Sequence, residues 1–112
     1  MVPIESSNDQ LIIGGKCFKS RLLTGTGKYR NLEEMKESIL NSEGEIVTVA
    51  VRRIKNSEEG HEGLMQALAW SKLWMLPNTA GCVNAEEAIR VARLGRELAK
   101  IAGQEDNNFI KL

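Results

Sequence analysis

A chain of 112 residues is one small domain or part of a larger one, and 42% hydrophobic with 27% charged residues is typical of a globular rather than a disordered protein. Fifteen basic and fifteen acidic side chains cancel, which gives no electrostatic reason to expect a nucleic acid or an acidic membrane surface as partner. No apolar run approaches the roughly 18 residues of a membrane span, and residues 1–10 lack the basic and apolar stretches of a secretion signal.

Residue types that bind metals are sparse in this sequence. Cys17 and Cys82 lie far apart and form no CxxC pair, and His61 is the single histidine. We therefore expect two reduced thiols, no disulfide framework and no metal site. His61 falls in a polar stretch, where we expect it to be solvated.

The first predicted element is a short hairpin. A Gly-Gly pair at 14–15 separates the apolar run 11–13 from a second run at 20–23, which predicts a hairpin over about residues 11–23. The second run continues into Thr-Gly-Thr-Gly at 24–27, a strand that ends in a glycine-rich turn. This turn matches neither the P-loop nor the dinucleotide-binding pattern, so we interpret it as a tight strand-to-helix connection.

The same capping signal predicts two amphipathic helices. Asn31 and Asn84 are each followed three positions later by a glutamate, which is the spacing of a capping box. The second helix is expected to stop at Gly103. The apolar face of the first helix holds Leu32, Met35, Ile39 and Leu40. The inward face of the second holds Ala88, Val91, Ala92, Gly95, Leu98, Ala99 and Ala102.

Three further apolar segments are predicted to be strands. Residues 46–51 are mostly β-branched, which is typical of a strand buried on both faces of a parallel sheet. Residues 73–76 form another strand, ended by a proline, and residues 109–112 form the last. Between the first two we expect a polar loop at 55–63 and a short helix at 64–70.

Alternating strands and helices place the chain in the α/β class, because parallel strands need right-handed helical crossovers. Four such steps are half of what closes a (β/α)8 TIM barrel. A final strand with no helix after it also leaves an uncovered edge. We therefore expect residues 1–112 to be the N-terminal half of such a barrel, with about four β/α units. A small open four-stranded sheet is the alternative.

Candidate functional residues follow the predicted strands. Arg52 and Arg53 come directly after one strand and Asn78 and Thr79 after the next, where barrel enzymes hold their substrates. The arginines suit an anion or, equally, a solvated strand end. Lys111 would point toward the axis of a closed barrel, where partial burial favours a neutral amine that can attack a ketone to give an imine. An exposed lysine is the plainer alternative.

Four segments of the sequence together resemble the successive signatures of thiazole synthase of thiamine biosynthesis. They occur in the same order and at compatible spacing, and the similarity covers about residues 11–112. Details around 70–74 and 103–108 look similar to the cyanobacterial and plastid forms. The segments are Leu-Leu-Thr-Gly-Thr-Gly-Lys-Tyr at 22–29, Val-Thr-Val-Ala-Val-Arg-Arg at 47–53, Leu-Pro-Asn-Thr-Ala-Gly at 76–81 followed by Ala-Glu-Glu-Ala at 85–88, and Phe-Ile-Lys-Leu at 109–112.

This resemblance implies a cytoplasmic or plastid-stromal transferase with a (β/α)8 barrel, which needs no cofactor and forms homo-oligomers. The implied substrates are 1-deoxy-D-xylulose 5-phosphate, dehydroglycine and sulfur from the thiocarboxylate of a small ubiquitin-like carrier protein. The lysine matched by Lys111 condenses with the ketone of the sugar. The resulting imine lets the carbonyl migrate along the chain before sulfur addition and ring closure give the thiazole phosphate.

The resemblance also shows what these 112 residues lack. In the family a glutamate follows the lysine shortly, and an aspartate and phosphate-binding glycine loops come later, all beyond Leu112. We therefore expect the segment to be inactive alone. The alternatives are a non-catalytic half-barrel that acts as a binding or assembly module, and an aldolase-type barrel with an imine lysine. The aldolase alternative leaves 76–81 and Arg52-Arg53 unexplained.

Overall fold

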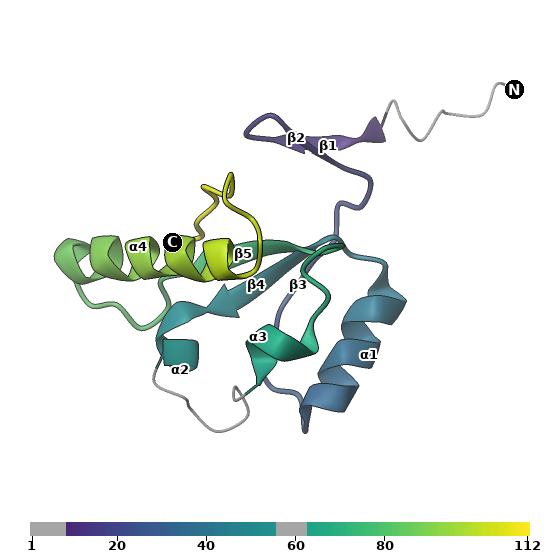
Figure 1. Ribbon diagram of the computed structural model, residues 1–112, viewed down its shortest axis with the longest axis horizontal. Helices are drawn as coiled ribbons and strands as arrows, with labels where there is room; N and C mark the ends of the chain where they lie inside the picture. Colours follow the sequence, from purple (N-terminus) through teal and green to yellow (C-terminus); the bar gives the residue numbers. More distant parts are fainter. Residues whose placement is uncertain (1–8, 56–62) are drawn as a thin grey trace, which may run out of the picture.

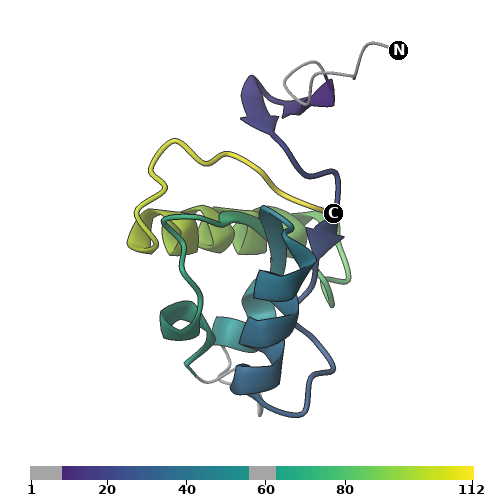
Figure 2. The ribbon, with the colours of Figure 1, turned by 90° about the vertical axis from the view of Figure 1, so that its right-hand side faces the viewer.

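The computed structural model describes residues 9–55 and 63–112, so His61 lies outside the described residues. Its centre is a parallel sheet with helices on one side and a hairpin on the other (Figures 1 and 2). None of the described helices is both long and apolar enough to cross a membrane. The α/β class predicted from the alternation of strands and helices is thus confirmed.

The parallel sheet has the order β3-β4-β5, which is also the order along the chain. Its strands are β3 (Leu23–Thr24), β4 (Ile46–Ala50) and β5 (Trp74–Asn78). A single parallel bridge, from Asn78 to Lys111, adds the end of the chain beside β5. The predicted last strand over 109–112 is therefore one rung rather than a ladder.

Side chains alternate between the two faces of β4 and β5, and both faces are buried. On one face, Val47, Val49 and Met75 pack against the helices. On the other, a second cluster forms with the hairpin and the end of the chain; its buried members are Phe18, Ile46, Trp74 and Leu76. This burial on both faces is what the β-branched run in the sequence predicted.

The hairpin is shorter than predicted. β1 (Leu11–Ile13) pairs with β2 (Lys16–Phe18), not with residues 20–23. Gly14 and Gly15 have φ values of 56° and 81°, which are the two left-handed positions that a tight two-residue turn requires. The return strand therefore starts at once, and the later run enters the other sheet as β3.

The two long helices begin where the caps predicted. In α1 (Leu32–Ser42) the Asn31 side chain accepts from the Glu34 N–H, and α4 (Ala85–Ile101) has the same bond from Glu87 to Asn84. The predicted inward face of α4 is buried or half-buried along its length. Leu40 of α1 was wrongly placed inward and is 76% exposed, because it is turned by about 100° from the buried Ile39.

We expect Asn84→Ala to lower the free energy of unfolding by about 1 kcal/mol, because the N–H of Glu87 loses its side-chain acceptor. Urea unfolding followed by circular dichroism measures this change. The matched control is Asn41→Ala on the exposed side of α1, where alanine favours the helix and stability should hold or rise slightly. Equal losses at both positions would contradict the capping role.

Three boundaries between β4 and the end of β5 differ from prediction. Strand β4 ends at Ala50, opposite the last residue of β5, and the chain turns into α2 (Val51–Lys55), so Val51, predicted as the strand end, and Lys55, predicted as the loop start, are both helical. Helix α3 (Leu64–Ala67) stops short of residue 70. Strand β5 continues through Pro77, because the missing N–H of this proline faces away from β4 and removes no bond between the two strands.

Candidate functional site

The candidate residues gather at the carboxyl edge of the parallel sheet. Ala50, Asn78 and Lys111 form one row across β4, β5 and the end of the chain. The backbone N of Lys111 donates to the Pro77 carbonyl at 2.9 Å, and the N of Thr79 donates to the Lys111 carbonyl at 3.1 Å. The structure thus brings Lys111 next to Asn78 and Thr79, which precede it by more than 30 positions in sequence.

Lys111 lies on the face of the sheet that is turned away from the helices. Register partners in a parallel sheet point to the same side, so Lys111 shares a face with Asn78. Leu76, two residues before Asn78, lies on the same side of the sheet and belongs to the cluster under the hairpin. The hairpin covers the amino end of this face, and Lys111 is exposed at the opposite, carboxyl end.

Asn78 and Thr79 shape the loop after β5. The Asn78 side-chain oxygen accepts from the N–H of Ala80 at 3.0 Å, and the Thr79 carbonyl accepts from the N–H of Cys82 at 3.1 Å. Thr79 is buried, whereas Asn78 is half-buried. These bonds hold the loop in a turn next to Lys111.

Arg52 has partners within the protein. Its Nη1 donates to the Gly81 carbonyl at 2.6 Å, and its Nε lies 3.6 Å from a carboxylate oxygen of Glu87. Gly81 has a φ of 88°, and a Cβ at this position would lie 2.3 Å from Arg52 Nη1. The arginine therefore links α2 to the loop after β5. No local pattern predicts this role, because the partners of Arg52 are about 30 positions away.

Arg53 lies near a different loop. A Cβ added at Gly27, in the turn after β3, would lie 3.9 Å from Arg53 Nη1. The two adjacent arginines of α2 therefore face the loops after two different strands, β3 and β5.

Among the described residues, no three His, Cys, Asp or Glu side chains are grouped as metal ligands would be.

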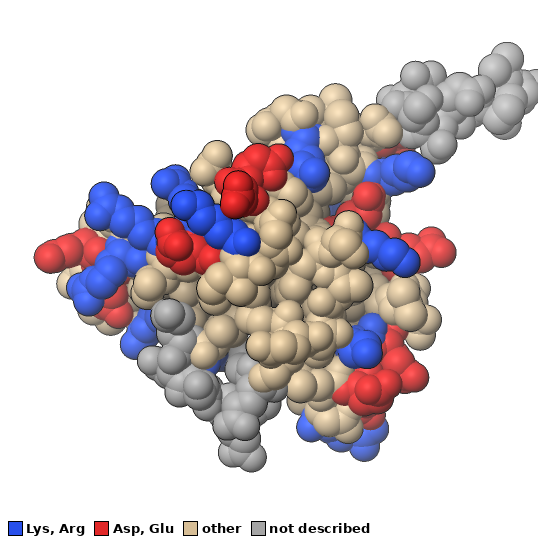
Figure 3. Space-filling model, viewed as in Figure 1, with Lys and Arg blue, Asp and Glu red and all other residues tan. Residues whose placement is uncertain are grey.

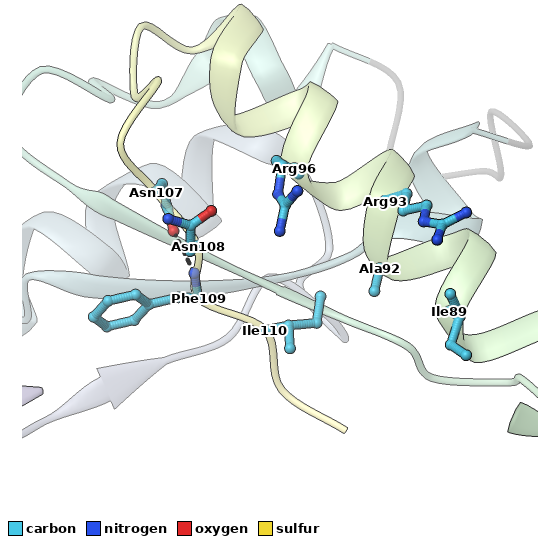
Figure 4. A pocket seen from close by; sticks show the side chains of 8 residues that line it. All are labelled: Ile89, Ala92, Arg93, Arg96, Asn107, Asn108, Phe109 and Ile110. Atoms are coloured by element: carbon cyan, nitrogen blue, oxygen red, sulfur yellow. Dashed lines mark hydrogen bonds between the residues drawn. The ribbon is translucent and has the colours of Figure 1, made fainter. Parts of the chain in front are cut away.

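A groove of about 340 Å³ runs between α4 and the end of the chain. Figure 4 shows Arg93 and Arg96 of α4 along one side of it and Asn107 and Ile110 along the other. Lys111 does not line this groove, so it is separate from the candidate site. Acidic and basic side chains are mixed around the outer parts of the face in Figure 3, whose middle is mostly uncharged, and no patch of basic side chains alone marks a nucleic-acid surface on this face.

Comparison with known proteins identifies the family. A family model described as thiazole biosynthesis protein ThiG matches residues 12–112. The chain is 67% identical over 109 residues to a thiazole synthase of Prochlorococcus marinus, covering 97% of this chain and 40% of that protein. It is 66% identical over 112 residues to a thiazole synthase of a Synechococcus species, covering all of this chain and 41% of that protein.

A bifunctional protein ThiO/ThiG of a Nostoc species is 67% identical over 110 residues, which cover 98% of this chain and 17% of that protein. The chain thus spans about two fifths of the length of the thiazole synthases that it matches. The match extends from the hairpin through the sheet to Lys111. This chain belongs to the thiazole biosynthesis protein ThiG family.

Proposed function

We propose that the protein is a thiazole synthase that builds the thiazole phosphate of thiamine, and that residues 1–112 supply about the first four units of a (β/α)8 barrel. Membership of the ThiG family supports the activity. The strand order supports the barrel, because neighbours in the sheet are also neighbours along the chain and all run parallel. A closed eight-stranded barrel requires both features.

The observation that carries the proposal is the position of Lys111. It lies at the carboxyl end of the sheet, on the face opposite the helices. When such a sheet closes into a barrel, this face becomes the interior, and the carboxyl end is where barrel enzymes place their active sites. Lys111 would then stand at the mouth of the barrel, beside Asn78.

Lys111 is the proposed catalytic residue. Its amine would attack the ketone of 1-deoxy-D-xylulose 5-phosphate, and loss of water from the adduct would give an imine. The protonated imine withdraws electrons, so a proton leaves the neighbouring carbon and the carbonyl can move along the sugar. Sulfur from the thiocarboxylate of the carrier protein and dehydroglycine then complete the ring.

The other predicted site residues would have different roles. Asn78 and Thr79 would form the wall next to Lys111, because their hydrogen bonds fix the adjoining loop. Arg53 remains a candidate for binding an anionic group. Arg52 is a candidate at the other loop, the one after β5, where it is bonded to the Gly81 carbonyl and paired with Glu87. We further propose that the full-length protein forms a homo-oligomer and binds the sulfur carrier.

Chemical trapping tests this function. The full-length protein is incubated with 1-deoxy-D-xylulose 5-phosphate and borohydride, and peptide masses locate the reduced adduct. We expect the adduct on Lys111, because reduction converts the imine into a stable amine. We expect none on residues 1–112 alone, since they span about two fifths of a thiazole synthase. An adduct on another lysine, or none in the full-length protein, would refute the assignment.

A further inference from the structure

The end of the chain is held beside β5 in an unusual way. Two backbone hydrogen bonds join it to the strand, and both involve Lys111. In regular parallel pairing, the next rung would use the N–H of residue 77 as donor to the Phe109 carbonyl. Residue 77 is a proline and has no N–H, so this bond cannot form. The ladder is therefore interrupted directly before the proposed catalytic lysine.

Where the ladder is interrupted, side-chain amides form the hydrogen bonds that the backbone groups do not form with each other. The backbone N of Met75 donates to Gln104 Oε1 at 3.1 Å, and its carbonyl accepts from Asn107 Nδ2 at 2.8 Å. Asn107 Oδ1 accepts from the N–H of Phe109 at 2.9 Å, as the dashed line in Figure 4 shows. The backbone groups of Met75 and Phe109 that would have bonded to each other are thus both satisfied through Asn107.

The two amides are buried and bonded to each other. Gln104 is 6% exposed and Asn107 is 2% exposed. Asn107 Nδ2 also donates to Gln104 Oε1 at 2.9 Å, and Gln104 Nε2 donates to the carbonyls of Trp70 and Leu73 at 3.0 and 2.7 Å. Buried polar groups need hydrogen-bond partners, and Gln104 and Asn107 find theirs in this arrangement. A shift of the segment that carries Lys111 along β5 would break these bonds and leave the buried amides unpaired.

We propose that Gln104 and Asn107 are positioning residues that fix the register of the segment carrying Lys111, an inference that rests on the proposed function. A slip by one residue would turn the lysine to the helix side of the sheet. A slip by two would keep the face but displace it by about 7 Å along the strand. The two backbone bonds of Lys111 alone would favour the observed register only weakly. The amides of Gln104 and Asn107 favour it further, because they make all their hydrogen bonds in this register.

The test measures the rate of imine trapping in the full-length protein. Asn107→Asp keeps the oxygen that accepts from Phe109 but replaces the donor to Met75 by an oxygen. We expect the rate constant for borohydride trapping on Lys111 to fall roughly tenfold or more, because misplacing a reacting group by an ångström costs rate steeply. The final fraction of molecules trapped should stay near that of the unsubstituted protein.

The matched control is Asn108→Asp, which adds the same charge at the adjacent, exposed position and should leave the rate constant unchanged. If Asn107→Asp does not fold, the neutral pair Asn107→Ser and Asn108→Ser replaces it in the same measurement. A lower trapped fraction with an unchanged rate constant would show a role in folding alone and overturn the inference. If the unsubstituted protein forms no adduct on Lys111, the proposed function itself fails, and the inference fails with it.

Discussion

Replacing Lys111 with arginine in the full-length protein is expected to lower thiazole formation by roughly 10⁴- to 10⁶-fold, the range that loss of a single catalytic-triad residue costs in a serine protease. Arginine keeps the positive charge and nearly the length of lysine. Its guanidinium does not lose a proton in proteins, so it offers no free amine to the ketone. The measurement is the rate at which the thiazole phosphate appears with all three substrates present.

Lys36→Arg is the control for this substitution. Lys36 is exposed on α1, which lies on the helix side of the sheet, whereas Lys111 lies on the other side. The same chemical change at Lys36 should therefore leave the rate of thiazole formation unaltered. Borohydride should also give no adduct on residue 111 of the arginine variant. If that variant still made thiazole at a rate near that of the unsubstituted protein, the imine mechanism would be wrong, while the family assignment would stand.

Local chemistry was enough to predict several elements from the sequence. The asparagine caps of α1 and α4 act within three residues, so the starts of both helices could be read directly. The spacing of small and apolar side chains likewise predicted which face of α4 is buried. The β-branched run of β4 predicted a strand buried on both faces, which the two clusters on either side of it confirm.

Features that depend on distant partners could not be predicted in the same way. Strand β4 ends at Ala50, opposite the last residue of β5, and Val51–Lys55 are helical; both depend on pairing with a segment about 28 positions away. Pro77 looked like a strand end because the side of β5 on which its missing N–H falls depends on the register. No local pattern marked Gln104 and Asn107 as structural residues, since both bond to Met75, about 30 positions away.

The arrangement of the candidate site was predictable only in part. Lys111 was singled out by its place near the end of an apolar segment and by the family resemblance, and the structure places it beside Asn78. Sequence reasoning could not separate the two adjacent arginines. The structure does, because Arg52 is bonded to the loop after β5 and Arg53 lies near the loop after β3.

The contact between α4 and β5 depends on a glycine in the middle of the helix. Gly95 is buried, and a Cβ added there would lie 2.7 Å from Pro77 Cβ and 3.2 Å from Val51 Cγ2. Both neighbours are held in place, Pro77 by its ring within β5 and Val51 by complete burial at the start of α2. Because residue 95 has no side chain, α4 can approach β5, the strand that pairs with Lys111.

Gly95→Val is expected to lower the free energy of unfolding by about 3 kcal/mol, because the added side chain overlaps atoms that have little room to move. Helix propensity works in the opposite direction, since valine is better than glycine within a helix. The measured loss is therefore a lower bound on the cost of overpacking, and urea unfolding of the full-length protein can detect it. In the control, Arg90→Val places valine on the exposed side of the same helix, where we expect a change within about 0.5 kcal/mol. A Gly95→Val protein as stable as the unsubstituted one would mean that α4 moves off β5 at little cost, contrary to the close packing around Pro77.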